Sequence, residues 1–482
     1  MRSKLYIRTD GSSSIGLGHL VRCIALARML SNDFEIFFAC KQIPDSIAGE
    51  IETDGYHLIR LKNDDDLTSI LSPTDLVVID SYELESDYQK SIKLIGCGLI
   101  CIDDLHEKTT YADLILNHTP GVSPSEYSAQ SYTQYALGPK YALIRPAFLN
   151  LAKKGRAHIK NESVLICFGG SDSRNLTKLA LEVVLGTKRF KKIFVVTGAA
   201  YAHHDSVNKI PGAEQHVFHY RNISAEDMAQ CMSEVDLCIV PSSGILTEAL
   251  TSGAKIISGM YVENQRFVFE NYKKSNAFIS AEDFTRENLT DAVENYFSQE
   301  PGTNQQLIDG FSGNRIQNLF QQLLYEKDFA LRDLAIGDAE LTYKWAVDEN
   351  VRKYSLSKGK IEFEEHISWL KRKLHDPQCR FYIASFSGES IGTIRFDIAD
   401  QEAVISYLLD PAYHGKGLGA TLLKRGILSF SNAPYFVNRI SGIVMRENIS
   451  SCKTFERFGF AKQSDGENYK YTMYIDDENR KI

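Results

Sequence analysis

Residues 4–31, KLYIRTDGSSSIGLGHLVRCIALARMLS, decide how the chain begins to fold. A short apolar strand, residues 5–7, leads into a loop with glycines at positions 11, 16 and 18. After the loop, apolar residues recur at helical spacing, at Leu20, Cys23, Ile24, Ala27 and Leu30. Strand, glycine loop and helix in this order predict an α/β domain that handles nucleotides. Glycines let a ligand approach the backbone, and a helix N-terminus favours phosphates.

His19 stands at the predicted start of this helix. The helix dipole disfavours a protonated imidazole there, so we expect a neutral His19 that accepts a proton. A second interpretation is that the glycines form only a tight turn and His19 has no chemical role. The glycine spacing, GxxxxGxG, departs from the dinucleotide fingerprint GxGxxG. The loop alone leaves both interpretations open.

Length and composition place the chain among large globular proteins. Its 482 residues are enough for roughly three domains, and its net charge of −8 does not favour nucleic acid or an anionic membrane surface. No apolar run approaches the roughly 18–20 residues of a membrane span, and the first residues lack a signal-peptide core. The nine cysteines form no CxxC pair, and there is no HExxH. We therefore predict reduced thiols, a cytoplasmic protein and no metal site.

Continuously apolar segments at residues 34–40, 76–80 and 98–104 predict strands of a parallel sheet covered on both faces. Ligands of such sheets lie beyond the carboxyl ends of the strands. Asp80, Ser81 and Tyr82 follow one strand, and the segment 103–106, DDLH, follows another. A lone aspartate at such a position more often caps the next helix. Two polar clusters at equivalent strand ends predict a shared site.

The segment RTDGSSSIGLGHLVRCIALA resembles the N-terminal signature of the UDP-sugar hydrolases of pseudaminic acid biosynthesis, and DSYELE, DDLHEKTTYADLILNH and YALIRPAFL resemble the same family. These enzymes hydrolyse UDP-2,4-diacetamido-2,4,6-trideoxy-β-L-altropyranose. The resemblance implies that His19 is catalytic, that Tyr82 contacts the sugar or positions water, and that Gly16 and Gly18 adjoin the substrate. Arg145 either steers the diphosphate or forms a structural entrance to a hinge.

A polar segment, residues 150–162, predicts a linker, after which strands recur at residues 163–170, 191–198, 216–220 and 235–240. Two similar halves joined by a linker resemble the two Rossmann-like domains of GT-B glycosyltransferases, the fold of the hydrolase family.

In the second half, PSSGILTEAL (241–250) predicts a strand end, a small-residue turn and a helix. The turn, Ser242–Gly244, can hold a pyrophosphate, and Glu248 can accept both ribose hydroxyls. A purely local capping box is the alternative. GT-B enzymes bind the nucleotide here, and YVENQ resembles the family's Asn-Gln motif. The resemblance implies substrate contacts from Ser242, Ser243, Gly244, Thr247, Glu248, Asn264 and Gln265.

The last part of the chain predicts three antiparallel strands, at residues 381–386, 390–398 and 403–410, followed by YHGKGLGA and a helix. YHGKGLGA resembles the acetyl-CoA pyrophosphate loop of GNAT N-acetyltransferases, and RENISSCKTFERFGF resembles the last segment of that family. Loop N–H groups at a helix start suit a diphosphate. The alternative is a glycine-rich turn without CoA. The resemblance implies cofactor contacts from His414, Gly415, Lys416, Gly417, Leu418, Gly419 and Asn448.

Two positions depart from the GNAT pattern. Phe455 stands where many members have a proton-donating tyrosine, and Val404 stands near a usual glutamate base. A water relay or one of three side chains can replace them, namely Tyr407, Ser406 or His366. Direct attack of an amine on a thioester leaves much of the rate to positioning.

We therefore predict an α/β protein with two Rossmann-like domains in a GT-B arrangement, residues 1–150 and 151–328, followed by an α+β GNAT domain, residues 329–482. The predicted activities are hydrolysis of the UDP-linked diacetamido sugar and acetyl transfer from acetyl-CoA to the 4-amino group of its UDP-amino-sugar precursor. The alternative is a GT-B glycosyltransferase that uses a UDP-amino-sugar, with a fused acyl-CoA-binding or acetylating domain. The predicted partners are the UDP-amino-sugar and acetyl-CoA, without metal, nucleic acid or membrane.

Overall fold

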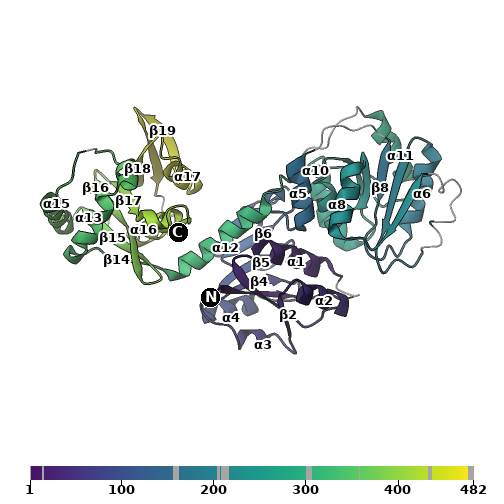
Figure 1. The fold of residues 1–482 in the computed structure, drawn as a ribbon, viewed down its shortest axis with the longest axis horizontal. Helices are drawn as coiled ribbons and strands as arrows, with labels where there is room; N and C mark the ends of the chain where they lie inside the picture. The colour runs from purple at the N-terminus through teal and green to yellow at the C-terminus, as the bar shows by residue number, and fades with distance from the viewer. Residues whose placement is uncertain are drawn as a thin grey trace. The chain divides into compact units, whose positions relative to one another are not determined.

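The computed structural model describes residues 2–12, 16–155, 162–203, 207, 216–299, 307–357, 359–431 and 437–475. Positions 13–15 of the glycine loop and 156–161 of the predicted linker lie outside these ranges. The chain divides into two compact units, residues 1–317 and residues 318–482. Figure 1 shows three sheets, of which the first two belong to the first unit.

The first sheet has seven parallel strands in the order β3-β2-β1-β4-β5-β6-β7. Its central strands β4 and β5 are buried along their whole length, as in parallel sheets that are covered on both faces. The strands are β1 (Ser3–Thr9), β2 (Phe34–Cys40), β3 (His57–Arg60), β4 (Leu76–Asp80), β5 (Gly98–Ile102), β6 (Leu114–Asn117) and β7 (Gln134–Leu137). The helices are α1 (Gly18–Leu30), α2 (Asp45–Thr53), α3 (Asp65–Thr68), α4 (Ser86–Ile95) and α5 (Pro146–Lys154), with 3-10 turns η1 (Pro124–Glu126) and η2 (Pro139–Tyr141).

The second sheet is also parallel, in the order β10-β9-β8-β11-β12-β13. Its strands are β8 (Ser163–Ile166), β9 (Lys192–Thr197), β10 (Val217–Arg221), β11 (Leu237–Pro241), β12 (Lys255–Gly259) and β13 (Ile279–Ser280). Its helices are α6 (Leu176–Thr187), α8 (Ala225–Glu234), α9 (Gly244–Ala249), α10 (Arg266–Lys274) and α11 (Arg286–Ser298), with a 3-10 turn η4 (Glu263–Gln265).

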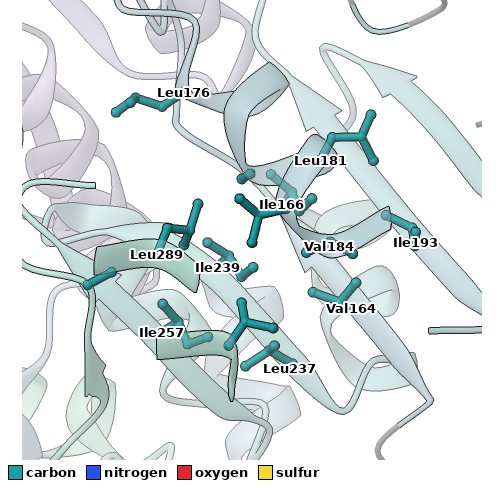
Figure 2. Close-up of a cluster of buried hydrophobic side chains, with 14 of the residues drawn as sticks. Val164, Ile166, Leu176, Leu181, Val184, Ile193, Leu237, Ile239, Ile257 and Leu289 are labelled. Carbon is teal, nitrogen blue, oxygen red and sulfur yellow. The ribbon is translucent and has the colours of Figure 1, made fainter. Parts of the chain in front are cut away.

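The core of the second sheet explains the apolar sequences of β8 and β11. Val164 and Ile166 point toward α6 and α11, where they pack with Leu181 and Leu289 (Figure 2). The intervening Leu165 packs on the opposite face, in a cluster that includes side chains from α5, α8 and α10. Since both faces of β8 are buried, the strand shows no alternation of apolar and polar residues.

In each parallel sheet, the strands that follow the first one are added on one side of it and then on the other, so the strand order reverses at one place. In the first sheet the reversal lies between β1 and β4, and in the second it lies between β8 and β11. Open α/β sheets bind ligands in the crevice beyond the strand ends at such a point. The helix α5 contains the predicted boundary between residues 150 and 151, and its Phe148 and Leu149 pack in the core of the second sheet. The three-domain division stays a proposal.

The second unit is built on a seven-stranded sheet in the order β14-β15-β16-β17-β18-β20-β19. Its pairings are antiparallel except for β17 with β18. The strands are β14 (Phe329–Asp333), β15 (Cys379–Phe386), β16 (Glu389–Ala399), β17 (Glu402–Leu409), β18 (Arg439–Met445), β19 (Ala461–Asp465) and β20 (Asn468–Tyr474). The helices are α12 (Ser312–Asp328), which spans the division between the units, α13 (Ala339–Val347), α14 (Glu349–Arg352), α15 (Phe363–His375), α16 (Leu418–Ser431) and α17 (Ile449–Arg457), with 3-10 turns η5 (Ile336–Asp338) and η6 (Pro411–Tyr413).

All nine cysteines are free thiols, and all but Cys231 are buried. Among the helices that the described residues form, none combines the length and the apolar character that a membrane crossing needs.

Candidate functional site

The reversal point of the first sheet holds a histidine–aspartate pair. His19 lies in the first turn of α1, and Asp80 is the last residue of β4. The Nδ1 atom of His19 lies 2.6 Å from Oδ1 of Asp80, and both side chains are buried. Arg22 Nη2 also lies 3.2 Å from Nδ1. The shorter contact with the carboxylate favours the tautomer that carries its proton on Nδ1, so we assign the lone pair to Nε2. The pair can therefore act as a general base.

Arg22 joins this pair to the next strand end. Its Nε and Nη2 atoms donate to Asp80 at 2.6 Å each, and Nη1 donates to Asp104 at 2.5 Å. Burial raises the pKa of Asp80, but the charge of Arg22 and the hydrogen bonds from Arg22 and His19 outweigh it and hold that pKa well below its usual range. The pKa of Asp104 is also lowered, because Arg22 outweighs the effect of burial. Both carboxyls are thus ionised at neutral pH.

Tyr82 packs against the ring of His19. The two rings meet edge to face, 4.5 Å apart at an interplanar angle of 78°, and the Tyr82 hydroxyl donates to Asp104 at 3.2 Å. Tyr82 remains 46% exposed. A pocket of about 150 Å³ opens beside it, lined in part by Ser81 and Asp103. The two polar clusters predicted at neighbouring strand ends therefore meet in one place.

The glycine loop places the start of α1 against β1. A Cβ at Gly11 would lie 2.3 Å from Cδ1 of Leu20, so only glycine lets the loop and helix approach this closely. Gly16 has a φ of +88°, a left-handed conformation that disfavours other residues. Gly18 is the first residue of α1, and a Cβ there would meet no atom within 4 Å. Substrate contact by Gly16 and Gly18 stays a prediction.

The second reversal point carries the predicted nucleotide turn. Ser242 follows β11, and its buried hydroxyl is hydrogen-bonded to that of Ser258 at 2.9 Å. Ser243 is the N-cap of α9 and Gly244 the first helical residue. The Ser243 side chain makes no capping hydrogen bond, which distinguishes this turn from the alternative of a local capping box. Thr247 is buried one turn into the helix.

Glu248 is paired with Arg145 across 103 residues of sequence. The Nε and Nη2 atoms of Arg145 donate to the two carboxylate oxygens at 2.7 and 2.8 Å. Burial raises the pKa of Glu248, although the Arg145 bond opposes this rise. Each carboxylate oxygen keeps a second lone pair, so the pair can still accept a hydroxyl. Arg145 is predicted to contact the diphosphate and Glu248 the ribose, and the two side chains contact each other directly.

Asn264 and Gln265 lie in η4, directly before α10. The Gln265 side-chain oxygen accepts the backbone N–H of Tyr261 at 3.0 Å, and Gln265 is buried. This bond fixes the turn that presents Asn264. Their contact with sugar or diphosphate stays a prediction.

The sequence did not single out Arg22. It lies three residues after His19 on α1, so both side chains project from the same side of the helix. An arginine among apolar helix positions is the signal that could have found it, since a buried guanidinium needs carboxylate partners.

In the second unit, the predicted loop lies between β17 and α16. Gly415 and Gly417 have φ of +75° and +79°, and a Cβ at either would meet no atom within 4 Å. His414 is tied back to β17, with Nε2 3.0 Å from the Leu409 carbonyl oxygen. Leu418 begins the 14-residue helix α16, and Gly419 follows it. Lys416 lies over the Tyr413 ring at 4.8 Å. The loop thus leaves an open helix N-terminus.

Asn448 caps α17 by accepting the Ser451 N–H at 3.1 Å. The same residue, Ser451, is hydrogen-bonded to the Tyr407 hydroxyl at 3.0 Å. Phe455 is buried and stacks on Tyr471 with ring centroids 5.2 Å apart, so it serves the core.

The other positions discussed as acid or base lie apart from Tyr407. His366 on α15 is buried, and its Nε2 lies 2.9 Å from the Thr342 hydroxyl. Strand residues alternate between the two faces of a sheet. Val404 and Ser406 therefore lie on the face of β17 opposite Tyr407.

Comparison with known proteins gives the second unit a family. The model of the acetyltransferase (GNAT) domain matches residues 328–461. This part of the chain is a GNAT domain. It is 28% identical over 130 residues to acetyltransferase PseH of Campylobacter jejuni, a match that covers 27% of this chain and 80% of that protein. The open loop at the start of α16, with its two left-handed glycines, fits the diphosphate of acetyl-CoA.

The first unit and the chain as a whole match further proteins. The first unit is homologous to UDP-2,4-diacetamido-2,4,6-trideoxy-beta-L-altropyranose hydrolase of Campylobacter jejuni, with 29% identity over 267 residues, 54% of this chain and 93% of the relative. The uncharacterized protein MJ1062 of Methanocaldococcus jannaschii is 27% identical over 485 residues, which cover 96% of this chain and 98% of that protein. The chain joins a hydrolase-like unit to the GNAT domain. The archaeal relative is similar to it across both parts, since the match covers nearly the whole of each chain.

Proposed function

We propose that the first unit hydrolyses UDP-2,4-diacetamido-2,4,6-trideoxy-β-L-altropyranose to UDP and the free sugar. The observation that carries this proposal is the 2.6 Å contact between His19 Nδ1 and Asp80 Oδ1 at the sheet reversal point. Homology to the Campylobacter hydrolase supports the substrate class. Asp80 holds the histidine with Nε2 as the basic atom, the arrangement that activation of a water requires.

In this proposal His19 Nε2 takes a proton from water as the water oxygen attacks the anomeric carbon. The bond between that carbon and the phosphate oxygen breaks, its electron pair stays on the diphosphate, and UDP leaves. Asp80 stabilises the imidazolium that forms, since its carboxyl is ionised. Tyr82 lies against the His19 ring and can orient the sugar or the water.

For the nucleotide we propose the second reversal point. The Ser242–Gly244 turn and Thr247 face the diphosphate, and the Arg145–Glu248 pair lies near the ribose and diphosphate. Asn264 and Gln265 complete the contacts from η4. These roles rest on the resemblance to the hydrolase family. They rest also on the position of the turn, which lies beyond the carboxyl end of β11, where open α/β sheets bind ligands.

For the GNAT domain we propose acetyl transfer to the 4-amino group of the UDP-amino-sugar that precedes the hydrolase substrate. The loop His414–Gly419 and Asn448 would hold acetyl-CoA, which supplies the acetyl group as a thioester. The free amine attacks the thioester carbonyl, the carbon–sulfur bond breaks with its electron pair on sulfur, and the proton that the nitrogen loses ends on that sulfur as the thiol of CoA. Similarity to acetyltransferase PseH supports this acceptor. Positioning of the two substrates supplies much of the rate.

The test of both activities uses the full chain with UDP-4-amino-4,6-dideoxy-N-acetyl-β-L-altrosamine and acetyl-CoA, followed by NMR. We expect free diacetamido sugar, UDP and CoA. An amine that stays unacetylated contradicts the second activity. A UDP-diacetamido sugar that accumulates without UDP release contradicts the first.

A second experiment separates hydrolysis from glycosyl transfer. The reaction is run in ¹⁸O-labelled water, and the released UDP is analysed by mass spectrometry. Unlabelled UDP, released without any acceptor sugar, is the expected result, because water attacks the anomeric carbon. Labelled UDP indicates attack at phosphorus, and release only after an acceptor is added indicates a glycosyltransferase.

A further inference from the structure

A second histidine lies at the same edge of the first sheet. His118 follows β6 directly, and Asp104 comes two residues after the end of β5. The two strands pair in parallel with Ile102 opposite Leu116, so Asp104 and His118 each come two residues after the last paired position. Neighbouring strands lie about 4.8 Å apart. His118 therefore extends the row of side chains that begins with His19 and Asp80.

The surroundings of His118 connect it to this row. Its ring interacts electrostatically with Asp104, Arg22 and Asp80. Burial lowers its pKa and outweighs the attraction of Asp104 for a protonated ring, so His118 is neutral at pH 7. Arg22 is committed to Asp80 and Asp104 through three of its nitrogens.

One unpaired nitrogen indicates which nitrogen of the His118 ring carries the proton. Nδ1 is buried and has no hydrogen-bond partner among the described residues. Buried N–H groups without partners are rarer than unfilled lone pairs. The neutral ring therefore carries its proton on Nε2 and leaves the lone pair on Nδ1. His118 presents an N–H donor, whereas His19 presents a basic nitrogen.

The backbone around His118 is fixed from both sides. Its carbonyl oxygen accepts the hydroxyl of Tyr272, from α10, at 3.4 Å. The preceding Asn117 accepts the Thr119 N–H through its side chain at 2.9 Å. Since α10 follows η4 with Asn264 and Gln265, His118 lies where the first sheet meets the proposed nucleotide half. In the proposed function the diphosphate joins a sugar at His19 to a uridine in that half, and His118 lies on the boundary between the two.

We infer that His118 is a further substrate-binding residue of the hydrolytic site, which donates a hydrogen bond from Nε2 to an oxygen of the UDP diphosphate. The inference rests on the proposed function. As the anomeric bond breaks, its electron pair moves onto the phosphate oxygen, and the N–H stabilises the growing charge without transferring its proton. The proton from water goes to His19. UDP and the free sugar are then the only products.

Three substitutions in the full chain test this assignment. Glutamine places an amide nitrogen near the position of Nε2, whereas asparagine reaches only the position of Nδ1, and alanine removes both. UDP affinity is measured by titration calorimetry, and thermal unfolding checks that each variant is folded. We expect His118→Gln to bind UDP within about threefold of wild type. His118→Asn and His118→Ala should bind about tenfold to a hundredfold more weakly, the effect of losing a hydrogen bond to a charged group.

Equal UDP affinity in all variants overturns the assignment, as does equal weakening by glutamine and asparagine. If alanine prevents folding, the glutamine and asparagine variants decide the matter. Turnover of the UDP-diacetamido sugar separates the two proposals. A wild-type chain that binds UDP but releases none from the sugar nucleotide contradicts the proposed hydrolysis, while the UDP affinities still decide the role of His118. A wild-type chain without UDP affinity contradicts both.

Discussion

The Nδ1 atom of His19 and the Oδ1 atom of Asp80 lie 2.6 Å apart at the point where the strand order of the first sheet reverses. The two residues are 61 positions apart in sequence and come from a helix start and a strand end. Their contact fixes which nitrogen of the imidazole is basic. The predictions for Asp80, on activity and on stability in acid, depend on this contact.

Asp80→Asn should lower kcat for UDP release by roughly a hundredfold to ten-thousandfold, because an amide no longer fixes the tautomer or stabilises the imidazolium. KM should change little. Asp113→Asn is the matched control. Asp113 directly precedes β6, so it lies at the amino ends of the strands, whereas Asp80 lies at the carboxyl ends. It is paired with Lys93 at 2.6 Å, and its substitution should leave kcat within about twofold. Equal kcat in wild type and Asp80→Asn would exclude the role of Asp80.

Acid should weaken the first unit through Asp80. Because the folded-state pKa of Asp80 is lowered, its contribution to stability is present above its unfolded pKa of about 3.9 and is lost as the pH falls through the folded value. Thermal unfolding of wild type and Asp80→Asn is compared from pH 3 to pH 8. The wild type should be more stable by about 3–5 kcal/mol above pH 5, the scale of a broken buried pair. The difference should shrink below pH 4, and a constant difference contradicts the charge of Asp80.

The Arg145–Glu248 pair should show strong energetic coupling. A double-mutant cycle with Arg145→Gln and Glu248→Gln, followed by chemical unfolding, should give a coupling of about 1–3 kcal/mol. The control is the Arg266–Glu263 pair, which has the same two-point geometry but side chains 54% and 77% exposed. Its coupling should be about 0–0.5 kcal/mol. Similar coupling energies in the two cycles would contradict the prediction that burial strengthens the Arg145–Glu248 interaction.

Gly417→Ala should weaken acetyl-CoA binding by about tenfold. The φ of +79° strains any other residue, by roughly 1–2 kcal/mol, in the loop proposed to hold the diphosphate. Gly466→Ala is the control, since Gly466 has a φ of +58° in the β19–β20 hairpin and equally open surroundings. Gly466→Ala should lower the melting temperature about as much as Gly417→Ala does, but it should leave the affinity for acetyl-CoA unchanged. The reverse pattern places the CoA diphosphate elsewhere.

Much of the fold is predictable because burial on both faces leaves a strong mark in sequence. The apolar runs at residues 34–40 and 76–80 coincide with β2 and β4, and the three antiparallel strands of the second unit are confirmed as β15, β16 and β17. The strands β6, β7 and β12 were not predicted, although β6 and β12 are largely buried, and neither were the short edge strands β3 and β13. β3 is half-exposed or exposed throughout, and β13 has only two residues, so neither carries such a run.

Side-chain partnerships in the sites were less predictable. Polar residues after β4 and β5 predicted a shared site, and the structure brings Asp80 and Asp104 together through Arg22. The pairing of Arg145 with Glu248 depends on how the two sheets of the first unit meet, which no local pattern records. The orphaned Nδ1 of His118 is likewise a property of packing.

The most direct measurement is the rate of UDP release from UDP-2,4-diacetamido-2,4,6-trideoxy-β-L-altropyranose by the full chain and by its His19→Ala variant. A general base contributes roughly a hundredfold to ten-thousandfold, so release by the variant should fall by that factor while its UDP affinity stays unchanged. Equal rates of UDP release in the two proteins would contradict the assignment of His19 as the base of a sugar-nucleotide hydrolase.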